Sequence, residues 1–86
     1  MKRPIYLDER MSEVVLDVLG EHTSAVGKFG AFNSRHEGYA VLLEEVDELW
    51  DVIKRNQAPA VLRAEAVQVA AMAIRFILDC CPRGES

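Results

Sequence analysis

Glutamates at helical spacing are the residues of this chain best suited to chemistry. The pair Glu45-x-x-Glu48 is followed, after residues 49–64, by Glu65-x-x-Gln68. Residues three apart on a helix share a face, so two such helices packed side by side would direct these oxygen-bearing side chains at one small volume. Carboxylates gathered in this way are costly unless a cation lies among them. Ligands that are all oxygen favour a hard ion such as Mg²⁺, which commonly brings phosphates with it.

The elements that must position these residues are three helices, because apolar residues recur with helical spacing and no strand pattern occurs. They are expected over residues 8–26, 38–55 and 59–79. Asp8 suits the N-cap of the first helix, and Pro59 suits the first turn of the third. Gly27 and Gly30 are expected to end the first helix and open a connector. The fold class is therefore all-α, a small bundle of about three helices.

Side chains on the second and third helices divide into distinct stripes. The second helix has a wide apolar stripe formed by Tyr39, Leu42, Leu43, Val46, Leu49, Trp50 and Ile53. A second stripe contains Val41, Glu45, Glu48 and Val52, and valines flanking acids indicate that these acids also face protein. The third helix is apolar nearly all round, apart from one polar line formed by Glu65, Gln68, Arg75 and Asp79. Such a helix belongs in the middle of a bundle, with its polar line facing water or a polar cavity.

Composition limits the classes of function. The chain has 86 residues, half of them apolar, which predicts one domain over residues 1–86 with marginal stability as a monomer. Its only cysteines, Cys80 and Cys81, are adjacent and predict free thiols in a reducing cytoplasm, so self-association is the expected support. The net charge of −4 and the lack of a basic patch argue against nucleic acid as a partner. Without a signal-like apolar start or a spanning segment, no membrane association is expected.

The motif and its surroundings resemble a known family. Glu44-Glu45-Val46-Asp47-Glu48 followed by Glu65-x-x-Gln68 resembles the all-α nucleoside triphosphate pyrophosphohydrolases of the MazG type, whose signature is E-x-x-E, a gap, and E-x-x-D. The run from His36 to Glu45 is also similar to short MazG-like proteins of phages and bacteria. The resemblance covers residues 36–78, half of the chain.

The resemblance implies an activity and a set of roles. Family members hydrolyse a nucleoside triphosphate to the monophosphate and pyrophosphate with Mg²⁺, or Mn²⁺ in its place, and associate as homodimers or homotetramers. By motif match, the carboxylates of Glu45, Glu48 and Glu65 would bind the metal and be required for catalysis, and Gln68 would complete the metal site. Glu44 would support the ligands or act as a helper base. Arg75, two turns beyond Gln68 on the polar line, is a candidate phosphate contact.

Gln68 is where the chain departs from the family signature, which has aspartate there. A glutamine carbonyl can coordinate Mg²⁺ but brings no negative charge and cannot act as a base. The departure leaves open a one-metal enzyme, an enzyme that uses Asp47 or Asp79 differently, and a nucleotide binder without catalysis. A non-catalytic structural bundle and a small regulatory partner of another protein are the remaining alternatives.

Overall fold

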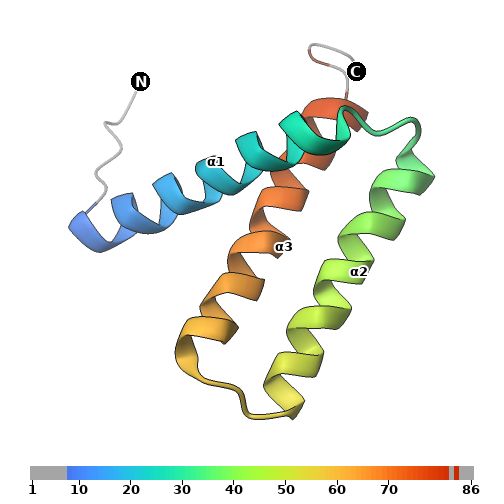
Figure 1. Cartoon of the computed structure of the whole chain (residues 1–86). Helices are drawn as coiled ribbons and strands as arrows, with labels where there is room; N and C mark the ends of the chain where they lie inside the picture. The colour runs from blue at the N-terminus through green and yellow to red at the C-terminus, as the bar shows by residue number, and fades with distance from the viewer. Residues whose placement is uncertain (1–7, 82, 84–86) are drawn as a thin grey trace, which may run out of the picture.

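Three helices arranged around the third one make up the part of the chain that the computed structural model describes, residues 8–81 and 83. They are α1 (Glu9–Phe29), α2 (Arg35–Lys54) and α3 (Pro59–Cys80), and no strand occurs within those residues. In Figure 1, α2 and α3 run antiparallel side by side, and α1 crosses the C-terminal half of α3. α3 packs against both other helices. The all-α class, the three helices and the central place of the third are thereby confirmed.

The ends of α1 follow from its capping residues. The Asp8 carboxylate accepts a hydrogen bond from the Met11 amide at 2.7 Å, which caps the first turn as expected. The helix then continues through Gly27 and ends at Phe29, three residues beyond the expected end. Gly30 supplies the stop, because its φ of 70° lies in the left-handed region that glycine adopts without strain.

α2 begins at Arg35, three residues earlier than the pattern of apolar residues indicated. The Ser34 hydroxyl accepts a hydrogen bond from the Glu37 amide at 3.0 Å. The Glu37 carboxylate in turn accepts one from the Asn33 amide at 2.6 Å. This is a variant of the capping box, because the Glu37 carboxylate accepts from the residue before the N-cap and not from the amide of the N-cap, Ser34. It fixes the helix start one turn ahead of the first apolar positions.

The enclosed core of a single chain is small. Its buried members are Val18, Ala25, Ala71 and Met72, with Val41, Leu42, Val67, Ala70 and Ile74 packed against them. Ala71 is fully buried, where α3 is covered by its neighbours. Many large apolar side chains remain exposed along α1, on α2 and at both ends of α3. No helix in the described part of the chain is both long and apolar enough to cross a membrane.

The burial of the two stripes of α2 differs from what the width of the apolar stripe indicated. The stripe that contains Val41 and Glu45 is the partly buried one, and Val41 packs against the core. Most of the wide apolar stripe is exposed instead. We refer to its exposed members as the outer face of α2: Tyr39, Leu43, Val46, Trp50 and Ile53. Trp50, the largest side chain of this stripe, is 55% exposed in the single chain.

Candidate metal centre and the pocket beside it

Three glutamates from two helices converge between α2 and α3. Glu45 and Glu48 lie one turn apart on α2, and Glu65 comes from the first half of α3. One carboxylate oxygen from each lies within 4.8 Å of the other two, an arrangement able to hold a metal ion. Glu45 and Glu65 are partly buried and Glu48 is exposed, so the cluster opens to solvent on one side. The acids that the sequence motif singled out are therefore brought together by the fold.

The pKa of the Glu45 carboxyl is raised by its surroundings in the cluster. Burial raises the pKa of its carboxyl from the usual 4.5 to about 7, helped by the charge of Glu48 and a hydrogen bond with it. The charges of Glu65 and Glu44 act in the same direction. Near neutral pH, a proton therefore occupies this carboxyl for a substantial part of the time in the metal-free protein.

The carboxyl of Glu65 is also partly buried beside other acids. Burial raises the pKa of its carboxyl, and the charge of Glu48 and a hydrogen bond with it act in the same direction. Its Oε2 atom is buried and has no hydrogen-bond partner within the described chain. An unpartnered buried carboxylate oxygen costs free energy, and a cation at the cluster would remove that cost.

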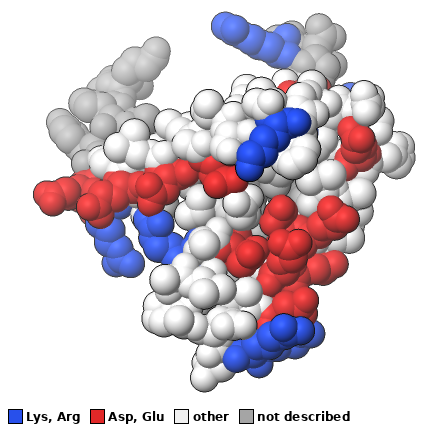
Figure 2. Space-filling view, in the orientation of Figure 1, with Lys and Arg blue, Asp and Glu red and all other residues white. Residues whose placement is uncertain are grey.

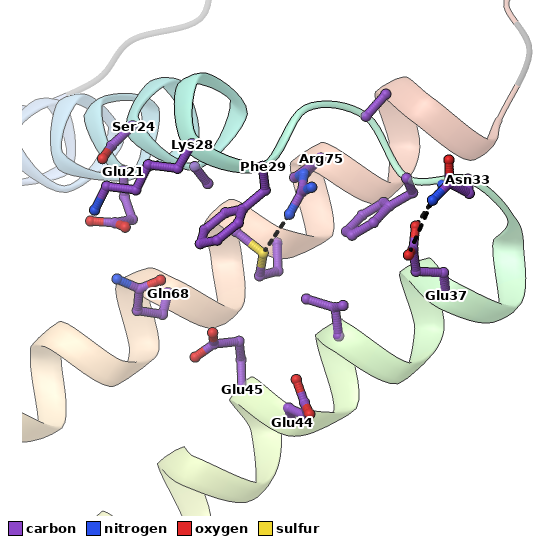
Figure 3. Close-up of a pocket in the computed structure, with 15 residues that line it drawn as sticks. Glu21, Ser24, Lys28, Phe29, Asn33, Glu37, Glu44, Glu45, Gln68 and Arg75 are labelled. Atoms are coloured by element: carbon purple, nitrogen blue, oxygen red, sulfur yellow. Dashed lines mark hydrogen bonds between the residues drawn. The ribbon is translucent and has the colours of Figure 1, made fainter.

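A cavity of about 440 Å³ adjoins the cluster, and Glu45 lines both. α1, the connector after it, α2 and α3 all contribute walls. Gln68, one turn beyond Glu65, is partly buried and lines the cavity, as does the exposed Glu44. Figure 3 shows the Gln68 amide and the Glu45 carboxylate directed at the same space from opposite helices, with Glu21 beyond them on α1. Two members of the polar line of α3, Gln68 and Arg75, thus line this cavity, which is one of the two expected environments.

Arg75 is the candidate whose surroundings differ most from expectation. It is only 4% exposed, although it lines the cavity. Its Nη2 donates a hydrogen bond to the Gly30 carbonyl at 2.7 Å, and its guanidinium carbon lies 3.9 Å from the centre of the Phe32 ring. Its Nε lies 4.0 Å from the Asp79 carboxylate and has no hydrogen-bond partner among the described residues. The guanidinium is therefore engaged with the connector.

The connector between α1 and α2 is fastened to the end of α3 at alternate residues. Besides the bond to the Gly30 carbonyl, the Asp79 carboxylate accepts a hydrogen bond from the Phe32 amide at 3.0 Å. The Cys80 thiol lies 3.8 Å from the carbonyl oxygen of Ser34. We call this set of contacts the connector clamp. It holds the segment that carries Phe32 and Asn33 into the wall of the cavity.

Close packing at Gly38 strengthens the same junction. A Cβ atom at this position would lie 2.7 Å from a ring carbon of Phe76 and 3.1 Å from one of Phe32. Only a residue without a side chain allows α2 to approach the two rings so closely. The first turn of α2, the connector and the end of α3 are consequently one tightly packed unit.

The cavity also contains residues that the sequence analysis did not select. Lys28, Phe29, Asn33 and Glu21 all line it, and Figure 3 shows them around the cavity with the glutamates and Gln68. Their signal in the sequence was weak, because a lysine in the last turn of a helix is already explained by the helix dipole. Phe29 is 71% exposed, so much of its ring is accessible at the edge of the cavity.

Acidic side chains dominate the surface around this site. Figure 2 shows Asp and Glu gathered along α1 and over α2 on the face that carries the cavity. Four glutamates line the cavity itself: Glu21, Glu37, Glu44 and Glu45. A concentration of one sign of charge attracts ions of the other sign, so the potential here favours cations. Phosphates alone would be repelled.

The chain has no match among models of known protein families, curated proteins or solved structures.

Proposed function

We propose that this protein is a Mg²⁺-dependent nucleoside triphosphate pyrophosphohydrolase, with Mn²⁺ able to replace Mg²⁺. The observation that carries the proposal is the convergence of Glu45, Glu48 and Glu65 to within 4.8 Å beside a cavity. The resemblance of residues 36–78 to the MazG-type enzymes supports it, because the convergent residues are those of the motif.

The residues present fit a divalent cation. The donors are all oxygens, which Mg²⁺ and Mn²⁺ accept. The buried Oε2 of Glu65 has no hydrogen-bond partner among the described residues, and burial together with the charge of Glu48 raises the pKa of Glu45. A bound cation would offset both costs. Glu45, Glu48 and Glu65 would hold the ion, and Gln68 would add a neutral oxygen from the next turn of α3.

Each residue has a task in the proposed hydrolysis. The oxygen of a water molecule bonds to the α-phosphorus, the bond from that phosphorus to the bridging oxygen breaks, and pyrophosphate leaves with that oxygen. When bound, Mg²⁺ neutralises phosphate charge in this kind of reaction. Glu44 lines the cavity and is exposed, so its carboxylate can take the proton of the attacking water. The cavity volume of about 440 Å³ suits a small-molecule ligand such as a nucleotide.

Self-association, as a homodimer or homotetramer, is part of the proposal. The outer face of α2 places large apolar residues at intervals of four and three, the spacing of a helix seam that packs against another helix. The enclosed core of one chain has few members, so the monomer buries little apolar surface. Burying the outer face of α2 against a second copy of the chain would add stability. Replacing Val46 with glutamate should reduce the mass measured by light scattering to that of one chain. A wild type that already has the mass of one chain would contradict this part.

A second candidate function is nucleotide binding without hydrolysis. Gln68 favours it, because the neutral amide contributes less to holding the ion than the aspartate of the family signature. Replacing Gln68 with aspartate separates the two candidates. Turnover that appears only in this variant would identify the natural protein as a binder, whereas lower turnover in the variant would identify glutamine as the suited ligand.

The proposal is tested by pyrophosphate release from a panel of ribo- and deoxyribonucleoside triphosphates with Mg²⁺, Mn²⁺ or EDTA. Metal-dependent release from at least one substrate is expected, and Glu48→Ala and Glu65→Ala should abolish it without loss of helicity by circular dichroism. Glu13→Ala is the matched control, since Glu13 is an exposed residue of α1 outside both cluster and cavity. Activity that survives both cluster substitutions would refute the proposed site.

A further inference from the structure

The cavity beside the glutamate cluster has two positively charged residues in its wall. They are Lys28, in the last turn of α1, and Arg75, on α3. The other charged lining residues are all glutamates. A polyphosphate ligand brings further negative charge, so a positive group free to meet it has a large effect on binding. Which of the two residues is free can be decided from their contacts.

Arg75 already has partners on most sides of its guanidinium. One terminal nitrogen donates to the Gly30 carbonyl at 2.7 Å, and the other lies 3.7 Å from the Met72 sulfur. The Phe32 ring covers one face at 3.9 Å from the guanidinium carbon. With only 4% of the residue exposed, its donors are used to hold the connector. Turning them to a phosphate would leave the Gly30 carbonyl without its donor.

The ammonium group of Lys28, unlike the guanidinium of Arg75, is not engaged by other residues within the described part of the chain. Lys28 is exposed, and among residues 8–81 and 83 no carboxylate oxygen lies within 4.0 Å of its ammonium group. Figure 3 shows its side chain extending along α1 and ending near Glu21 in this view, above the part of the cavity that Gln68 and Glu45 line. An ammonium group on a flexible stem is a common point-charge contact for phosphates.

We propose that Lys28 contacts the phosphates of the bound nucleotide, the role first considered for Arg75, and that Arg75 is a positioning residue of the connector clamp. The inference rests on the proposed function, because it concerns the same ligand. It also gives the acidic cavity a reason to accept a triphosphate: the ion held by the glutamates on one side and Lys28 on the other both counter its charge.

The test is binding of a nucleoside triphosphate analogue that carries a methylene group between the α- and β-phosphorus atoms and cannot release pyrophosphate. Affinity is measured by calorimetry with Mg²⁺ for the wild type, Lys28→Met and Lys54→Met. Lys54 is the matched control, because it is an exposed lysine outside the cavity whose partner, Asp51, is also exposed. Loss of a charge-assisted hydrogen bond corresponds to about a ten- to hundredfold weaker affinity. We expect that loss in Lys28→Met and less than about a twofold change in Lys54→Met.

A second measurement separates a phosphate contact from a structural role. Mn²⁺ binding without nucleotide should be the same in Lys28→Met as in the wild type, and Lys28→Arg should recover part of the analogue affinity. If Lys28→Met binds the analogue as tightly as Lys54→Met, or loses Mn²⁺ and analogue binding together, the role of Lys28 is refuted while the proposed function stands. A wild type that binds Mn²⁺ but no analogue of any base would refute the proposed function and this inference with it.

Discussion

Replacing Glu45 with glutamine is expected to stabilise the metal-free protein at neutral and alkaline pH. The pKa of this carboxyl is about 7 in the folded protein, against 4.5 for an ordinary glutamate, chiefly because the group is partly buried and next because Glu48 is close. The folded protein therefore keeps the proton to a higher pH than the unfolded chain does. The metal-free wild type accordingly loses stability as the pH rises from about 4.5 to about 7, and remains at the lower value above that.

The size of the effect follows from the same pKa. The full difference corresponds to about 3 kcal/mol in the free energy of unfolding, at about 1.4 kcal/mol per pH unit. Solvent reaches one side of the cluster and screens the charges, so we expect about 1–2 kcal/mol at pH 8. Glutamine has nearly the same shape and no charge, so Glu45→Gln should be more stable than the wild type by about that amount at pH 8. The wild type and Glu45→Gln should have nearly equal free energies of unfolding at about pH 4.5.

Urea unfolding in EDTA, at one fixed protein concentration, measures this difference. A gain of about 1–2 kcal/mol corresponds to a midpoint about 1 M higher for a chain of this size. Glu13→Gln, at an exposed site on α1, serves as the control and should change stability by less than about 0.5 kcal/mol. Saturating Mg²⁺ should reduce the difference in urea midpoint between Glu45→Gln and the wild type, because the ion stabilises the wild type more than the variant. Equal midpoints for Glu45→Gln and the wild type at pH 8 would refute the reasoning.

Two further predictions concern the junction that shapes the cavity. Gly38→Ala should lower the free energy of unfolding by about 1–3 kcal/mol, because the new Cβ would meet a ring carbon of Phe76 at 2.7 Å. Urea unfolding measures the loss, and an unchanged midpoint would contradict this close packing. Arg75→Met should release the connector clamp, so amide hydrogen exchange at Phe32 should become faster while exchange in the middle of α2 changes less. Undiminished protection of that amide would show that the clamp does not depend on the arginine.

The fold class and the meeting of the motif acids could be predicted from the sequence because both depend on helical periodicity. Acids three apart share a helix face, and the apolar character of the third helix places it between the other two. The start of α2 was also within reach, since Ser34-x-x-Glu37 is a capping-box pattern ahead of the first apolar residues. Periodicity in the apolar residues alone placed this start one turn too late.

The environments of Arg75, Lys28 and the outer face of α2 could not be predicted in the same way. The main partner of Arg75 is a backbone carbonyl 45 residues away, and its position depends on how the connector folds onto α3. Lys28 faces a cavity formed by all three helices, which no single helix pattern contains. A wide apolar stripe indicates a buried face, but the pattern does not tell whether its cover belongs to the same chain.

Calorimetric titration of Mn²⁺ into the metal-free protein, comparing the wild type with Glu65→Gln, tests the central claim most directly. The claim predicts saturable binding by the wild type, with release of protons at about pH 6.5, where the Glu45 carboxyl is largely protonated before the ion binds. Glu65→Gln should bind at least about tenfold more weakly, because one of the three convergent carboxylates has lost its charge. Absence of saturable binding by the folded wild type, or equal affinity in the variant, would contradict the claim that these glutamates form a metal centre.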